Sequence, residues 1–359
     1  MKTMIALLLL AAPLAAQDVV RFRDPAKNPD LEGDIVTLTC KAVEIEVLVD
    51  GVRIKRAIDA RDIADLVPRK SIDLAKAEEA LANGDLNAAL QRFERVAGDP
   101  RAGELPSQSA AIRIVRTHAE AGNHAAALQS ARALRARKQD GYYVGESYQL
   151  EVKTLLAMQD PKQAAAVVKA FLAQGNALVA LDWIRDGEIL EARVMEQQGN
   201  WRGALATYRK HAKDPAVADE IALGEMRCLT ALNDWPGLRR RADAVIKESL
   251  TKKNADPRTL IAAFTGRGDL DMNDGKPKEA LLSYLQGAIV LNRGEKSPEH
   301  EVALARSSMT CAKLAAAEKT REAKDLHRGR AQELYRELAS LYPRTAFKSP
   351  LDKLLQEIR

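Results

Sequence analysis

The sequence predicts a mainly α-helical protein: an α-solenoid of helix hairpins preceded by a small antiparallel β module that curls into a barrel-like shape. Three observations support this fold class. A pattern of Gly, four residues and then Ala-Leu recurs along the chain. Aromatic residues make up only 4% of the 359 residues while Ala and Leu are frequent, as is typical of closely packed helices. From Val19 to about Pro68, by contrast, the apolar pattern has a period of two.

The first residues have the pattern of a secretory signal peptide. Lys2 precedes an apolar run from Met4 to about Ala12, and the small residues Ala15 and Ala16 follow. An apolar run of this length is too short to span a bilayer. No Cys comes directly after the run, so the pattern predicts removal of residues 1–16 and an exported protein, periplasmic or secreted, that is not a lipoprotein.

The net charge of +5 and the pI of about 9.0 are compatible with contact to nucleic acid, an anionic membrane surface or an acidic protein. Predicted export argues against nucleic acid. Cys40, Cys228 and Cys311 lie far apart, whereas a disulfide framework or a zinc site needs pairs at close spacing. We expect three small buried side chains, and one disulfide in an oxidising compartment stays open.

The β module, residues 17–70, is predicted by an alternating pattern from about Val19 to Pro68 and by one turn signal. Apolar side chains alternate with other residues from Val43 to Val49, and again from Val52 on the far side of Asp50-Gly51. Asp-Gly between two such runs indicates a tight hairpin, because both central residues need positive φ. We expect four or five short strands, similar in plan to small SH3-like or Sm-like barrels, packed on the helices that follow.

The repeat is predicted from the recurring turn pattern. Gly84, Gly122, Gly199 and Gly275 are each followed after four residues by Ala-Leu. Two segments without the Gly, at Asp160 and Asn233, stand where further copies belong, so that neighbouring copies are 34 to 42 residues apart. Each copy has an apolar helix before the turn and a second helix after it. Such hairpins bury one face within the pair and another against the next pair.

These residues resemble tetratricopeptide (TPR) repeats. The segment "GDLNAALQRFERVAGDP" has the turn Gly, the Ala, an aromatic residue and a late Pro in the order of that family, and the last copy, "RAQELYRELASLYP", follows the same order. The resemblance covers residues 71–343 and implies six or seven TPR-like units. Most units exceed the usual length, and the third and fifth are degenerate. The polar segment 344–359 is expected to form a C-terminal capping helix.

No sequence motif indicates catalysis, a cofactor or a metal. GxSxG, P-loop, HExxH and paired CxxC patterns are absent. Asp269, Asp271 and Asn273 fit the first positions of a calcium loop, but Asp274 replaces the required Gly and Glu279 comes one residue early. His118 and His124 lack a third ligand nearby and are expected on the surface of a repeat.

The TPR resemblance also predicts a binding surface, since the first helix of each TPR unit lines a concave groove that holds a partner segment. Alignment on the turn places Arg116, Arg193 and Arg227 at equivalent groove positions, with Thr154 between them. We hypothesise a basic stripe for an acidic or extended peptide. The alternative is arginines lying over Ala and Leu on a solvated helix surface.

The sequence therefore predicts a non-enzymatic, exported scaffold for protein partners, with no cofactor and no transmembrane span. The Lys/Asn clamp by which some TPR proteins hold a C-terminal carboxylate is missing, since Leu74 and Glu78 stand there in the first unit and Ile112 and Arg116 in the second. The alternative is an enzyme, or a non-catalytic subunit, with an unrecognised site in the β module or at a partner interface. Glycan or small-ligand capture ranks last, because the groove lacks aromatic residues. The oligomeric state and the partner's identity are not predicted.

Overall fold

A computed structural model describes residues 17–69, 72–249, 251, 255–290 and 296–358. The predicted signal peptide, residues 1–16, lies outside these described residues. The chain divides between Leu190 and Glu191 into two compact units, which we call the N-terminal unit and the C-terminal unit. In the described residues, no helix combines the length and the apolar character that crossing a membrane requires.

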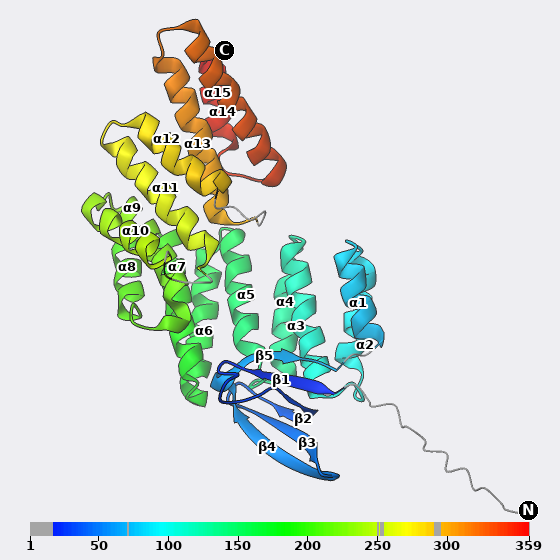
Figure 1. Cartoon of the computed structure of the whole chain (residues 1–359). Helices are drawn as coiled ribbons and strands as arrows, with labels where there is room; N and C mark the ends of the chain where they lie inside the picture. Colours follow the sequence, from blue (N-terminus) through cyan, green and yellow to red (C-terminus); the bar gives the residue numbers. More distant parts are fainter. Residues whose placement is uncertain (1–16, 70–71, 250, 252–254, 291–295, 359) are drawn as a thin grey trace, which may run out of the picture. The chain divides into compact units, whose positions relative to one another are not determined.

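The N-terminal unit begins with a five-stranded antiparallel sheet (Figure 1). Its strands follow one another in the order β4-β3-β2-β1-β5, and the two end strands do not pair. The sheet is therefore open and not closed into the predicted barrel. The strands are β1 (Asp18–Phe22), β2 (Leu31–Leu38), β3 (Ala42–Val49), β4 (Val52–Asp59) and β5 (Ile63–Val67).

The predicted hairpin is confirmed, since β3 and β4 pair along their whole length around Asp50 and Gly51, with φ of 51° and 81°. Closure of the sheet would need β4 to pair with β5. The free edge of β5 instead faces the first helices, with which it lines a groove. The outer strand β4 has exposed basic side chains at Arg53, Lys55 and Arg56, which suit an edge in contact with water.

The sheet packs on the helices, as the sequence predicts. Its buried face includes Val43 and Ile45, both fully buried, and Leu105 of α3 (Glu104–Glu120) completes the same apolar cluster. Gln108 of α3 donates a hydrogen bond of 2.9 Å to the carbonyl of Leu38 in β2. A helix side chain thus satisfies a strand backbone group, and this bond helps to hold the sheet against α3.

The described residues contain seven helix hairpins and a final helix. In each hairpin the first helix has the odd number and the second the even number. The hairpins are α1 (Ile72–Ala82) with α2 (Leu86–Gly98), α3 with α4 (His124–Arg137), α5 (Val144–Ala157) with α6 (Pro161–Leu178), α7 (Leu181–Gln197) with α8 (Trp201–Lys210), α9 (Ala218–Ala231) with α10 (Trp235–Ser249), α11 (Pro257–Asn273) with α12 (Pro277–Leu285), and α13 (Pro298–Ala317) with α14 (Arg321–Leu341).

One turn geometry joins the helices of the first six hairpins. The turn residue has positive φ and donates its N–H to a carbonyl three residues earlier, while the next N–H bonds five residues back, which is a Schellman motif. The predicted glycines occupy four of these turns. In the two degenerate copies Gln159 and Asn233 take the left-handed conformation instead, with φ of 58° and 54°. The third turn therefore lies one residue before the predicted Asp160.

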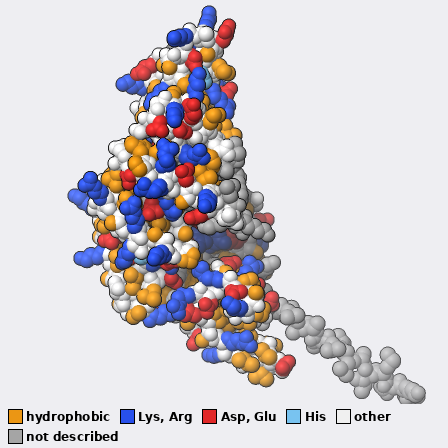
Figure 2. Space-filling view, turned by 60° about the vertical axis from the view of Figure 1, so that its left-hand side comes forward, with side chains coloured by type: hydrophobic (Ala, Val, Ile, Leu, Met, Phe, Trp, Pro, Cys, Tyr) orange, Lys and Arg blue, Asp and Glu red, His pale blue; other side chains and the backbone are white. Residues whose placement is uncertain are grey.

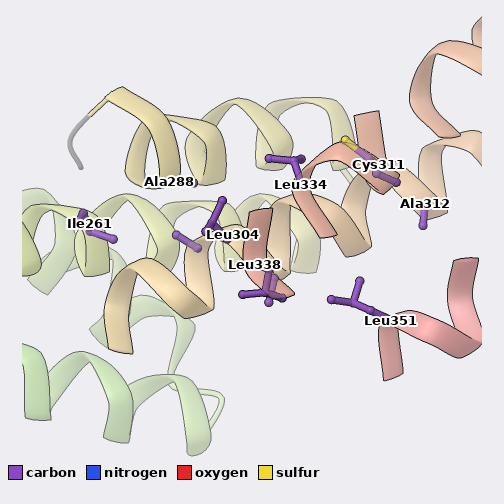
Figure 3. Packing of buried hydrophobic residues seen from close by; sticks show 11 residues of the cluster. Ile261, Ala288, Leu304, Cys311, Ala312, Leu334, Leu338 and Leu351 are labelled. Carbon is purple, nitrogen blue, oxygen red and sulfur yellow. The ribbon is translucent and has the colours of Figure 1, made fainter. Parts of the chain in front are cut away.

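The core of the last hairpins is an apolar cluster in the C-terminal unit (Figure 3). Leu304 and Cys311 of α13 and Leu334 and Leu338 of α14 are buried in it. The segment predicted to cap the repeats forms α15 (Lys348–Glu357), whose Leu351 is fully buried in the same cluster. The polar remainder of α15 is mostly exposed, which suits the end of a helical stack.

Candidate functional site

The first helices carry a charged residue six positions before each turn residue. Because the third turn is at Gln159, this position is Lys153 and not the predicted Thr154, which is buried and donates a hydrogen bond to the carbonyl of Leu150. Lys153 is exposed. The complete series is Glu78, Arg116 and Lys153 in the N-terminal unit and Arg193, Arg227 and Asp269 in the C-terminal unit.

Each of the three predicted arginines has a carboxylate partner on a neighbouring first helix. Arg116 donates two hydrogen bonds to Glu146 of α5, at 2.5 and 2.7 Å, and these bonds raise the pKa of the guanidinium. Arg193 pairs with Glu220 of α9. All three guanidinium groups remain partly exposed, so whether they also bind a partner stays a prediction.

Arg227 lies in a network that connects two hairpins. It donates two hydrogen bonds to Glu196, at 2.7 and 3.0 Å, and the buried Tyr208 donates one of 2.5 Å to the same carboxylate. Hydrogen bonds from Tyr208, which is buried, and from Arg227, which is partly exposed, thus compensate the desolvation of the Glu196 carboxylate. On the face shown in Figure 2, acidic and basic side chains are interspersed.

A second network of the same kind follows in the C-terminal unit. Tyr284 of α12 donates a hydrogen bond of 2.6 Å to Asp269, and Nε of Arg306 in α13 lies 3.7 Å from that carboxylate. Burial raises the pKa of Asp269, and the positive charge of Arg306 partly offsets this effect. Arg306 was not predicted, because the turn after α13 lacks the Gly pattern on which the copies were aligned.

These two networks border an apolar pocket of about 320 Å³ in the C-terminal unit. The first helices α9, α11 and α13 form most of its wall, which includes Leu223, Met226, Ala262 and Val302. Arg227 and Arg306 also line it. Consecutive first helices therefore enclose a pocket that accommodates an apolar side chain, with guanidinium groups at its border.

The carboxylate of Glu299 adds a polar group to the pocket wall. Its Oε1 lies 4.0 Å from Nη1 of Arg227, and its Oε2 is buried without a hydrogen-bond partner. Glu299 stands in the first turn of α13, where the helix dipole favours negative charge. A ligand that brings an N–H group to this wall would satisfy the unpaired oxygen.

A second groove, of about 610 Å³, lies in the N-terminal unit. Residues 64–68 of β5 and its end form one side, and α1 and α3 form the other. Arg116, the first predicted arginine, lines this groove together with Arg113, and Nη2 of Arg113 lies 3.2 Å from Glu78. The floor is apolar, with Leu66, Leu74 and Ile112 buried.

A polar pocket of about 570 Å³ lies beside the sheet. It is the place where an enzymatic site in the β module, the alternative predicted from the sequence, would be expected. Cys40 lines it, but burial and the nearby Asp140 raise the pKa of the Cys40 thiol, which disfavours the reactive thiolate. Arg61 donates several hydrogen bonds to Asp59 and lowers the pKa of that carboxyl to about 2. Both groups therefore stay charged, and the carboxylate is a poor proton acceptor.

The candidate metal residues do not form a ligand cluster. Within the described ranges, no group of three or more His, Cys, Asp or Glu side chains is placed to hold a metal ion. Asp269, Asp271 and Asn273 belong to the regular helix α11 and not to a calcium-binding loop. The Nδ1 atoms of His118 and His124 are buried without hydrogen-bond partners in the described structure.

Comparison with known proteins supports the fold. No family model matches the sequence, and no curated protein does either. Among solved structures, a tetratricopeptide repeat protein from Parabacteroides merdae matches with a TM-score of 0.54 and 14% sequence identity, over 80% of this chain and 97% of that one. This likeness confirms the TPR-like fold.

Proposed function

We propose that the protein is an exported, non-enzymatic scaffold, and that an extended segment of a partner protein binds along its first helices. The TPR-like fold supports a role in protein interaction. The observation that carries the proposal is the apolar pocket between α9, α11 and α13 in the C-terminal unit. An apolar side chain of the partner enters this pocket, and stacked helices that hold it open reduce the ordering cost of binding.

The charges of the pocket refine the expected partner. The pocket lining contains two basic side chains, Arg227 and Arg306, and two acidic ones, Asp269 and Glu299. Its net charge is therefore close to zero. A carboxylate of the partner would reach the exposed part of Arg306, whose side chain is 44% exposed and contacts Asp269 only at 3.7 Å. A backbone or side-chain N–H would reach Glu299. The segment is thus apolar at its centre and polar at both ends.

The test blocks the pocket without disturbing its ion pairs. Ala262→Phe places a large side chain in the pocket wall, while Ala206→Phe, on the exposed side of α8, is the matched control. Proteins from the native envelope fraction are cross-linked to each variant and identified, with folding checked by circular dichroism. We expect partners that the wild type and Ala206→Phe retain and that Ala262→Phe loses.

Other outcomes would contradict the proposal at different levels. Equal retention by all three proteins would exclude the pocket as the binding site. Failure of the folded wild type to retain any protein would argue against a scaffold and favour the alternative that the protein is an enzyme. Export has its own test: the periplasmic or secreted fraction of native cells should contain a chain that begins after Ala16.

A further inference from the structure

The size of the pocket between α9, α11 and α13 limits which side chain of a partner can fill it. Its volume of about 320 Å³ corresponds to roughly ten molecules of liquid water. Two small residues, Ala231 and Ala262, form part of the wall and help to leave this space open. An aliphatic side chain would fill only part of it, and unfilled apolar space forfeits packing contacts. A bicyclic aromatic side chain uses the volume best.

Two groups in the wall favour an aromatic ring over an aliphatic chain. Met226 places a thioether in the lining, and sulfur makes favourable contacts with aromatic rings. Arg227 also lines the pocket, and its Nε and Nη2 already donate hydrogen bonds to Glu196. A planar guanidinium held in this way still offers its face for stacking on an aromatic ring, and the attraction is strongest for the ring of Trp.

The carboxylate of Glu299 requires a hydrogen-bond donor. This side chain is 12% exposed, its Oε1 lies 4.0 Å from Nη1 of Arg227, and its Oε2 is buried without a partner among the described residues. A buried acceptor without a donor is costly, and more so when it is charged. The last torsion of a glutamate side chain is soft, so a donor in the pocket can reach either oxygen while the other stays near Arg227.

A neutral donor suits this position better than a cation. Lysine and arginine side chains also bring N–H groups, but they would meet Arg227 and Arg306 in the same pocket and lose their hydration. Phenylalanine has a ring without a donor, and tyrosine has its donor on a smaller ring. Tryptophan joins the largest apolar ring system of the natural side chains to one N–H donor.

We propose that the partner side chain in this pocket is a tryptophan, whose indole N–H donates a hydrogen bond to the carboxylate of Glu299. The proposal rests on the proposed function, because it names the residue by which the partner segment is recognised. It goes further in one respect, since the pocket selects one side chain and does not accept apolar residues in general. Glu299 is the residue that determines this specificity.

The test uses three capped single residues as probes of the chain lacking residues 1–16. N-acetyltryptophanamide carries the indole, the corresponding benzothienylalanine amide has sulfur in place of the N–H at nearly the same shape, and N-acetyltyrosinamide has the smaller ring. Ligand-observed NMR measures the weak binding that a single residue provides. We expect the tryptophan probe to bind about tenfold more tightly than the benzothienyl probe, because the latter leaves the charged acceptor unpaired. The tyrosine probe should also bind more weakly, since it fills less of the pocket.

Three variants assign the effect to Glu299 and to the pocket. Glu299→Met removes the acceptor and keeps a long side chain, so the tryptophan and benzothienyl probes should bind within about twofold of each other. Glu301→Met is the matched control, because Glu301 stands in the same first turn of α13 but does not line the pocket, and it should keep the tenfold difference. Ala262→Phe should abolish binding of the tryptophan probe. Circular dichroism verifies that each variant is folded.

Four results would overturn the proposal: equal binding of the tryptophan and benzothienyl probes by the wild type, a difference that persists in Glu299→Met, tighter binding of the tyrosine probe, or no binding of the tryptophan probe by the folded wild type. Unchanged binding by Ala262→Phe would also overturn it, because the probe would then occupy another site. The proposed function is judged separately. If Ala262→Phe loses cross-linked envelope proteins while the tryptophan probe fails, the scaffold stands and the selectivity for tryptophan does not.

Discussion

The ring of Tyr208 occupies the space that a side chain on Gly224 would need. A Cβ on this glycine of α9 would lie only 2.3 Å from the tyrosine ring, and a Cβ on Gly268 of α11 would lie 2.4 Å from Tyr284. Both tyrosines are almost completely buried and donate hydrogen bonds to the carboxylates of the two networks. The two glycines therefore allow the tyrosines to reach the acids beside the pocket.

Gly224→Ala should destabilise the protein, although Ala is normally the better helix residue. At an open helix position, Gly→Ala stabilises by about 0.5–1 kcal/mol. Here the ring must move, and we expect a net loss of roughly 1–3 kcal/mol. Gly329→Ala in α14 is the control, since a Cβ there meets no atom within 4 Å. In urea unfolding, the midpoint should fall for Gly224→Ala and rise for Gly329→Ala. A rise for both would contradict the close contact.

Gln159→Gly should stabilise the third hairpin. Gln159 has φ of 58° at a turn where four other copies have Gly, and the left-handed conformation costs roughly 1–2 kcal/mol for most residues. Glycine also has more freedom in the unfolded chain, which offsets part of this benefit. We therefore expect a net gain in stability of about 0.5–1 kcal/mol. Asn233→Gly should gain less, because Asn tolerates this conformation. Differential scanning calorimetry compares the two variants with Gly199→Ala, which should lose stability. An equal effect of all three would argue against strain at Gln159.

Glu151→Gln should strongly lower the stability of the protein, although it replaces only one carboxylate oxygen by an NH2 group. The Glu151 side chain is 1% exposed and pairs with Arg132 at 2.9 Å and with Arg135, whose side chain is 13% exposed. Loss of the charge leaves Arg135 buried without its counterion, which costs on the order of 3 kcal/mol. Arg132→Ala should cost much less, since that side chain is 57% exposed. Chemical denaturation measures both. A similar loss for the two variants would show that burial of the pair does not matter.

His300 should make the C-terminal unit sensitive to acid. Its ring is 1% exposed, lies 2.9 Å from the hydroxyl of Tyr342 and 3.0 Å from the carbonyl of Ala288, and burial lowers its pKa. The unfolded chain, with an ordinary His pKa, takes up the proton more readily. Stability is therefore complete above about pH 6.5 and falls as the pH drops toward the lowered pKa of the folded state.

The variant His300→Gln tests this pH dependence, because Gln keeps one donor and one acceptor but does not titrate. Thermal unfolding at about pH 7.5 and about pH 5.5 is compared for the two proteins. We expect the wild type to lose more stability between these values than the variant does. Equal losses would show that the buried imidazole does not determine the acid response.

The sequence was most informative where structure is local. A turn residue and the Ala-Leu pair fix the geometry of one hairpin without reference to the rest of the chain, and Asp50-Gly51 does the same for β3 and β4. The one-residue error that placed Thr154 instead of Lys153 arose because Gln159 adopts a conformation that sequence rules reserve for Gly and Asn. The local sequence does not indicate that this glutamine adopts positive φ.

Long-range features could not be predicted. Glu146 and Glu220 lie some thirty residues from their arginine partners, and nothing in their local sequence marks them as ligands of a guanidinium. The open sheet was missed for a similar reason, because the alternation within β5 does not reveal that its second edge faces α1 and α3. Packing between elements decides these contacts.

The position of β1 in the sheet has a consequence for how the chain folds. The strands from β1 to β4 each pair with the next one along the sequence, and the hairpins likewise need only neighbouring segments. The pairing of Val19 in β1 with Val67 in β5 is the exception, because it joins residues at opposite ends of the β module. Contacts between distant residues form slowly, since the loop must close before the contact stabilises it. Addition of β5 to β1 is thus expected to be the slow step of the β module, after the hairpins have formed.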